Sequence, residues 1–205
     1  MPQDALIKYI KQLKREAFTT RELASFSGKS VSLVNQGLEY LKSQGAVVKI
    51  YRGVWAEVTA KSLSPFSVAP FLFSGRQVYV SFISALHLHG IIEQIPQTVT
   101  VASLGHSRTL RTQAGTFVVH HLAPDFFKGF DWYKGSGDFL IAEPEKALVD
   151  CLYLSGRKGK RFAHFPELHF GPNFSFKKCL VWARDIRDPK LRVFVVKGLK
   201  QLEQG

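Results

Sequence analysis

The sequence predicts an α+β protein of two domains, and three observations support this prediction. The chain has 205 residues, enough for two modest domains that each bury a core. Helical periodicity and one pair of β-rich runs fill the first sixty residues, whereas further on four strand-like runs precede the last helices. Residues 59–75 lie between the two patterns and contain two prolines, four serines and several large apolar residues. We therefore expect domains at residues 1–58 and 76–205, joined by a packed connector at 59–75.

The first domain is predicted to contain three helices and a hairpin. The run ALIKYIKQL repeats apolar residues at helical spacing. Thr19–Glu22 has the Thr-x-x-Glu pattern of a capping box, which starts a short second helix that ends at Gly28. A third helix begins near Ser30 and ends at Gly45, and two β-rich runs then meet at Arg52-Gly53. This is the order of a winged helix-turn-helix.

The third helix is predicted to have one apolar and one polar face. At about 100° per residue, the apolar residues form a single stripe: Val31, Val34, Leu38 and Leu41. The opposite side carries short amides and hydroxyls, which exchange hydrogen bonds with base edges and phosphates, although Leu33 and Tyr40 also face outward. In a winged helix-turn-helix this helix lies in the major groove of DNA. Two alternatives remain open: a solvated face that is short of charge, and a winged helix used for protein contact.

Candidate DNA contacts follow from this placement. The residues that we expect to read base edges are Lys29, Ser32, Asn35 and Gln36. The residues that we expect at the DNA backbone are Thr20 and Arg21 at the start of the second helix, Ser30 at the start of the third, and Lys49 and Arg52 on the hairpin.

The charge of the chain favours a polyanionic partner. The net charge is +12 and the isoelectric point is about 9.8. Residues 1–60 carry nine cations and five anions, residues 61–153 seven of each, and residues 154–205 twelve cations and four anions. Four of these cations lie on the two sides of Gly159 and serve as candidate additional phosphate contacts: Arg157, Lys158, Lys160 and Arg161. The alternative is an ordinary solvated loop.

The second domain is predicted to be mixed α/β with a basic helical end. Strands are expected at 77–80, 98–103, 115–122 and 137–143, where β-branched and aromatic residues cluster. One helix follows Ser81 and stops at Gly90. Another opens at Pro144, a residue favoured in the first helical turn. Two more helices are expected, one with an apolar face from Phe176 to Ile186 and one starting at Asp188.

Catalysis, metal binding and cofactor binding are not predicted. Neighbouring strand residues such as His120 and His121 point to opposite faces and cannot chelate one ion. The sequence has neither clustered carboxylates with an acidic-x-Lys element on a strand nor a glycine-rich phosphate loop. Its two cysteines stand in apolar contexts, as core thiols of a reducing cytoplasm do. We expect a cytoplasmic protein, since the N-terminal residues lack the apolar core of a signal peptide and no run is long enough to span a membrane.

Three stretches of the second domain carry a recognisable pattern over about residues 78–155, in this order: YVSFISALHLHGIIEQIPQTVTVAS, SRTLRTQAGTFVVHHLAPDFFKGF and FLIAEPEKALVDCLYLSG. Together they resemble the AbiEi family of transcriptional regulators. The winged helix ahead of them fits the same architecture. Glu143 departs from the pattern, in which a small capping residue precedes the proline.

This resemblance implies the antitoxin of a type IV toxin–antitoxin system linked to abortive phage infection. Such a protein is an autorepressor that binds inverted repeats in its own promoter. Its functional counterpart is a nucleotidyltransferase-like toxin, with which a stable complex is not expected. The alternatives are a protein-interaction antitoxin whose winged helix is mainly a scaffold, and a solitary transcriptional regulator.

Overall fold

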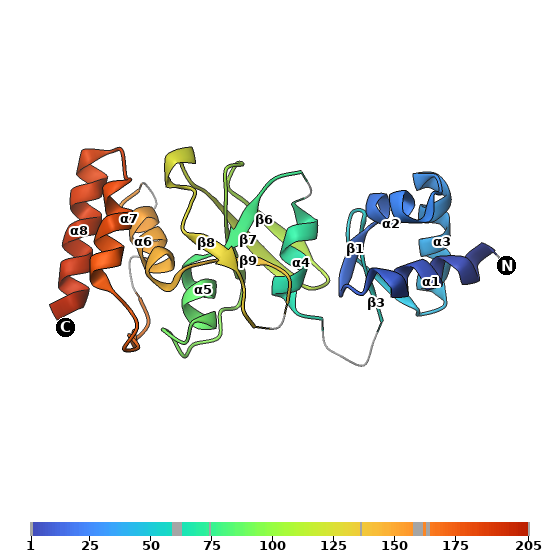
Figure 1. Ribbon diagram of the computed structural model, residues 1–205, viewed down its shortest axis with the longest axis horizontal. Helices are drawn as coiled ribbons and strands as arrows, with labels where there is room; N and C mark the ends of the chain where they lie inside the picture. Colours follow the sequence, from blue (N-terminus) through green and yellow to red (C-terminus); the bar gives the residue numbers. More distant parts are fainter. Residues whose placement is uncertain are drawn as a thin grey trace. The chain divides into compact units, whose positions relative to one another are not determined.

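The computed structural model describes residues 2–58, 63–73, 75–135, 137–157, 162 and 165–204. The chain divides into two compact units (Figure 1). Unit 1 comprises Met1–Gly75 with Arg111–Gly115, and unit 2 comprises Arg76–Leu110 with Thr116–Gly205. Helices and sheets occur in the chain together, so the predicted α+β class is confirmed. Over the described ranges, no helix combines the length and the apolar character needed to cross a membrane.

Unit 1 contains four helices and a three-stranded sheet within its described residues. Its elements are α1 (Pro2–Leu13), β1 (Ala17–Thr19), α2 (Thr20–Ser27), α3 (Val31–Ser43), β2 (Val47–Tyr51), β3 (Val54–Glu57) and α4 (Pro65–Leu72). The first three helices and the β2–β3 hairpin lie where the sequence predicted them. Strand β1 was not predicted, because three residues are too few to show alternation. It pairs antiparallel with β3, giving the strand order β1-β3-β2.

The turn from α2 to α3 is built by local capping. The Glu22 N–H donates to Thr19 Oγ1 at 3.0 Å, and the Thr19 N–H donates to the Glu22 carboxylate at 3.4 Å, which confirms the predicted capping box. Gly28 ends α2 with φ 66°, a left-handed conformation that only glycine adopts without strain. Ser30 Oγ then accepts from the Leu33 N–H and caps α3.

One hydrophobic core joins the first three helices to the sheet of unit 1. It consists of Leu6 and Ile10 from α1, Phe18 from β1, Leu23 and Ala24 from α2, Val34, Leu38 and Leu41 from α3, and Val47 and Trp55 from the hairpin. Since α3 contributes a stripe at helical spacing, the core fixes which face of α3 remains outside.

Helix α4 lies in the segment for which the sequence indicated a connector without helical periodicity. The prediction of a non-helical segment is corrected, whereas the prediction that the segment packs is confirmed. Pro65 occupies the first helical turn, where its missing N–H costs nothing. Pro70 interrupts the periodicity that marks a helix in a sequence. Burial of Val68, Ala69 and Leu72 nevertheless stabilises this short helix.

Unit 2 contains a six-stranded mixed sheet in the order β6-β7-β5-β4-β9-β8. The strands are β4 (Val78–Val80), β5 (Val99–Ser103), β6 (Arg108–Thr112), β7 (Gly115–His121), β8 (Phe130–Trp132) and β9 (Leu140–Ala142). Strands β4, β5, β7 and β9 are the four predicted ones. Strands β6 and β8 were missed because they lie at the two edges of the sheet. Edge strands bury few side chains, so they lack the apolar alternation that marks a strand in a sequence.

The helices of unit 2 are α5 (Phe82–Leu88), α6 (Pro144–Ser155), α7 (Phe176–Arg184) and α8 (Pro189–Gln204), with a 3-10 turn at Pro124–Phe126. Helices α6, α7 and α8 pack against one another at the end of the unit (Figure 1). Helix α5 packs on α6 and on β5. The sequence predicted that α8 starts at Asp188, and Asp188 caps it, since its Oδ1 accepts from the Lys190 and Leu191 N–H groups.

Replacing Thr19 by Ala should destabilise unit 1 by about 1 kcal/mol, the typical effect of losing an N-cap hydroxyl. The Thr19→Ser variant keeps a hydroxyl at the cap and should lie close to the native protein. Urea unfolding followed by circular dichroism measures both differences. Equal stabilities of the Ala and Ser variants would show that the cap does not hold α2.

Candidate nucleic-acid interface

Helix α3 presents a polar surface because its apolar stripe is buried. Val34, Leu38 and Leu41 are buried in the core of unit 1. Val31 was predicted to belong to this stripe, yet half of its surface is exposed, because it stands in the first turn ahead of the core. The predicted base-reading residues lie on the outside: Ser32, Asn35 and Gln36 are exposed, and Lys29 is partly exposed. Their amides and hydroxyls are therefore available to a partner.

Three of the predicted backbone contacts also lie on the surface. Arg21 on α2, Ser30 at the start of α3 and Arg52 in the β2–β3 turn are exposed. Ser30 already accepts one hydrogen bond as the cap of α3. Its hydroxyl proton remains able to donate to a phosphate oxygen.

Thr20, by contrast, faces the interior of unit 1. It is 5% exposed, and its Oγ1 accepts from the Trp55 indole N–H at 3.0 Å. Its backbone N–H donates to the Gly53 carbonyl at 2.9 Å. Thr20 therefore joins the start of α2 to the hairpin. The sequence suggested an exposed phosphate contact because Thr20 stands in the first turn of a helix, where N–H groups meet anions.

Lys49 is already engaged by an acidic residue of α3. Its Nζ donates to the Glu39 carboxylate at 2.6 Å and lies 4.9 Å from the centre of the Trp55 ring. The hydrogen bond from Lys49 lowers the pKa of Glu39, so this carboxylate stays ionised. The predicted phosphate contact of Lys49 thus competes with a partner inside unit 1.

The basic loop after α6 lies mostly outside the described residues. Lys158, Lys160 and Arg161 all fall there. Arg157 is described, and its guanidinium lies 4.6 Å from the centre of the Tyr153 ring. This geometry holds the cation on the aromatic face at the end of α6.

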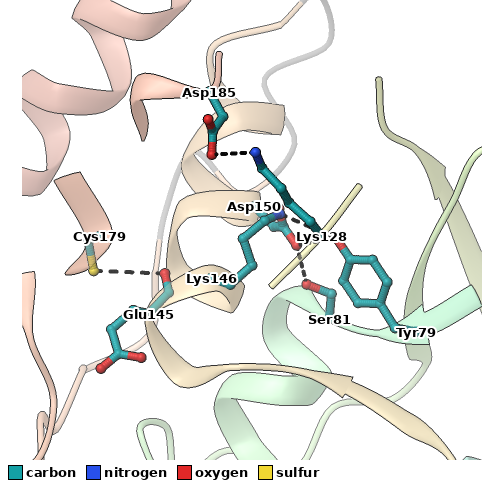
Figure 2. Close-up of polar contacts among 8 residues, drawn as sticks. All are labelled: Tyr79, Ser81, Lys128, Glu145, Lys146, Asp150, Cys179 and Asp185. Carbon is teal, nitrogen blue, oxygen red and sulfur yellow. Dashed lines mark hydrogen bonds and ion pairs between the residues drawn. The ribbon is translucent and has the colours of Figure 1, made fainter. Parts of the chain in front are cut away.

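Unit 2 contains a buried ion pair that sequence reasoning missed. Lys146 and Asp150, one turn apart on α6, are both fully buried and form a direct ion pair. Figure 2 shows that the Asp150 carboxylate also faces the start of α5. There it accepts from Ser81 Oγ at 2.7 Å and from the Tyr79 hydroxyl at 3.1 Å. The pair therefore connects α6 to β4 and α5.

Burial dominates the electrostatics of this cluster. It raises the pKa of Asp150 and lowers the pKa of Lys146, because desolvation outweighs their mutual attraction. The Lys146 ammonium also lies 3.9 Å from the centre of the Phe126 ring, which offers it a second favourable contact. Desolvation and the nearby Asp150 raise the pKa of Tyr79 well above its usual range. These groups are closed to solvent, and their contacts join α6 to β4 and to the start of α5.

The sequence contains a signal for this ion pair. The motif Pro-Glu-Lys-Ala-Leu-Val-Asp places Lys146 and Asp150 four residues apart in a helix whose other residues are mostly apolar. Opposite charges at this spacing on a buried face indicate an internal ion pair. The neighbouring Glu143 is the N-cap residue of α6, and its side chain makes no capping hydrogen bond. Glu143 and Glu145 instead both pair with Lys178 of α7, at 3.1 and 3.5 Å.

The two adjacent histidines lie as the strand periodicity predicted. His120 is buried and its ring lies 4.8 Å from that of Phe82, whereas His121 is exposed. Cys151 and Cys179 are free and buried, as expected of core thiols. Among the residues that the structure describes, no three His, Cys, Asp or Glu side chains are grouped so that they could hold a metal ion.

No family model matches the chain, and no curated protein matches its sequence. The likeness to AbiEi regulators therefore stays a prediction.

Replacing Lys146 by Met should destabilise the protein by about 3–5 kcal/mol, since it leaves the Asp150 carboxylate buried without its cation. The double variant Lys146→Met/Asp150→Leu removes both charges and should recover most of this loss. Chemical unfolding at pH 7 measures the difference. A double variant as unstable as the single one would contradict the role of the unpaired charge.

The loss in Lys146→Met should also depend on pH. Burial raises the pKa of Asp150, and removing Lys146 raises it further. A group whose pKa is raised on folding contributes stability below its unfolded pKa, about 3.9 for Asp, and this contribution is lost as the pH rises through the folded pKa. The variant should thus be closer in stability to the native protein at pH 5 than at pH 8. If the difference in unfolding free energy between Lys146→Met and the native protein did not change with pH, the loss of stability would come from altered packing.

Proposed function

We propose that the protein is a cytoplasmic, sequence-specific DNA-binding transcriptional repressor whose residues 1–58 act as a winged helix-turn-helix. The observation that carries this proposal is the exposed polar surface of α3, with Ser32, Asn35 and Gln36 outside and the Val-Leu stripe in the core. The capped α2–α3 turn and the antiparallel β2–β3 hairpin supply the remaining elements of such a domain.

The chemistry of this surface suits base recognition. A side-chain amide such as that of Asn35 or Gln36 donates and accepts at once, and so matches the N6 and N7 edge of adenine. Each such bidentate pair discriminates against a wrong base by about 1–3 kcal/mol. Lys29 adds a donor suited to guanine. An apolar or carboxylate-rich surface in this place would favour a protein partner instead.

Cations around this surface suit the phosphates of a duplex. Arg21 and Arg52 are exposed on the same unit, and the N-terminus of α3 offers backbone N–H groups. Arg157, Lys158, Lys160 and Arg161 are candidates for further phosphate contacts from the second domain. The net charge of +12 supports association with nucleic acid generally.

The biological role that we propose rests on the resemblance of residues 78–155 to AbiEi regulators. In this role the protein represses its own promoter at inverted repeats. It serves as the antitoxin of a type IV system without enzymatic activity, and it opposes a nucleotidyltransferase-like toxin without forming a stable complex with it. An adjacent reading frame that encodes such a toxin would support this role over that of a solitary regulator.

A protein-interaction role for unit 1 is the second candidate, and exposed apolar side chains favour it. These are Phe26 on α2 and Val31, Leu33 and Tyr40 on α3, each about half exposed. In that case residues 1–58 serve as a scaffold for a protein partner, and the polar surface of α3 does not recognise a DNA sequence.

The double variant Asn35→Ala/Gln36→Ala should lose specific DNA binding. A mobility-shift titration on the protein's own upstream region, at fixed salt, should show affinity reduced at least tenfold, because two base-reading amides are removed. Weak binding to a scrambled duplex should persist, since it depends on phosphate contacts.

Gln12→Ala, which removes an exposed amide of α1, is the matched control and should bind like the native protein. Equal, weak and salt-sensitive binding of both duplexes by the native protein would reject sequence readout by α3. That result would favour the scaffold role.

A further inference from the structure

The polar surface of α3 contains an anion that DNA binding by itself does not explain. Glu39 lies four residues after Asn35 and three after Gln36, and so on the same side of the helix, one turn further on. A carboxylate near the phosphates of a duplex is repelled by them, and the hydrogen bond from Lys49 lowers the pKa of this one and so keeps it charged. Its position therefore points to a task other than contact with DNA.

The Glu39 carboxylate holds one cation of the hairpin. Lys49 Nζ donates to it at 2.6 Å, whereas Lys42, on the same helix as Glu39, lies further away at 3.7 Å. Lys49 belongs to β2, so the closer ion pair joins α3 to the hairpin. The β2–β3 register shifts between Lys49 and Tyr51, directly beside this contact.

The Lys49 ammonium also contacts a buried aromatic ring. Its Nζ is 4.9 Å from the centre of the Trp55 ring, and Trp55 is fully buried. The Trp55 indole in turn donates to Thr20 Oγ1 at 3.0 Å, which ties it to the start of α2. Glu39, Lys49, Trp55 and Thr20 thus form one connected line from α3 through the hairpin to α2.

We propose that Glu39 is a positioning residue for DNA recognition: it sets the hairpin relative to α3 through Lys49, and Lys49 acts through this contact rather than on a phosphate. This inference rests on the proposed function. Both side chains are partly exposed, so the pair adds little to stability. The ion pair acts instead on the relative orientation of α3 and the β2–β3 hairpin, which must both contact one duplex.

Positioning and simple electrostatics predict opposite results when Glu39 is neutralised. Removing an anion from a DNA-binding surface tightens binding to any sequence if charge alone matters. If Glu39 positions the hairpin, Glu39→Gln weakens binding to the specific site and leaves binding to a scrambled duplex unchanged or slightly tighter. The ratio of the two affinities separates the two cases.

The experiment measures affinity for the protein's own upstream duplex and for a scrambled duplex at one salt concentration. We expect Glu39→Gln to lower the ratio roughly threefold to fivefold, the size typical of one partly exposed ion pair. The charge-swapped variant Glu39→Lys/Lys49→Glu rebuilds the pair with its charges exchanged and should restore the ratio to within about twofold. Glu16→Gln removes an exposed carboxylate elsewhere on unit 1 and should leave the ratio unchanged.

Three outcomes are decisive. An unchanged or increased ratio of specific to scrambled affinity in Glu39→Gln would overturn the positioning role. A charge-swapped variant that binds both duplexes equally weakly would also overturn it, and would make Lys49 a phosphate contact. A melting temperature of Glu39→Gln far below that of Glu16→Gln would assign the effect to folding and also overturn it. Failure of the proposed function itself is recognised separately, because the native protein would then not distinguish the duplexes at all.

Discussion

The buried Trp55 side chain links the elements of unit 1 that carry the proposed DNA contacts. It is fully buried, donates to Thr20 at the start of α2, and lies below the Lys49 ammonium that Glu39 of α3 holds. Trp55 therefore contacts the start of α2 directly and is linked to α3 through Lys49 of the hairpin. A buried indole N–H needs an acceptor, so Thr20 must face inward and cannot serve a phosphate with its side chain. The exposed side chains of α2 and α3, such as Arg21 and Asn35, remain available to a partner.

Unit 2 is organised around a different constraint, the cost of burying charge. Lys146 and Asp150 lie where no water reaches, and each is supported by more than its partner: Phe126 beside the ammonium, Ser81 and Tyr79 on the carboxylate. Replacing such a pair by apolar residues is often harmless to stability, whereas breaking it is not. The cluster thus favours one way of docking α6 on β4 and α5. The cluster stabilises the fold of unit 2, whereas the surface that we propose for DNA binding belongs to unit 1.

Most of this architecture could be predicted from the sequence because its signals are local. The capping box at Thr19, the glycine after α2 and the Val-Leu stripe of α3 each act within a few residues. Strands β6 and β8 and helix α4 were missed since their stability comes from neighbours in space. The same holds at the candidate site: exposure of Asn35 and Gln36 follows from helical periodicity, whereas the inward turn of Thr20 and the engagement of Lys49 depend on Trp55, 35 residues after Thr20.

The proposed recognition of DNA by α3 can be followed residue by residue through the backbone and side-chain amides of the full-length, nitrogen-15-labelled protein in NMR spectra. The protein is titrated with a duplex from its own upstream region. The largest shifts are expected at residues 29–36 and at the side-chain amides of Asn35 and Gln36, with smaller ones at Arg21 and Arg52. Shifts confined to residues 76–205, with α3 unchanged, would contradict recognition by this helix.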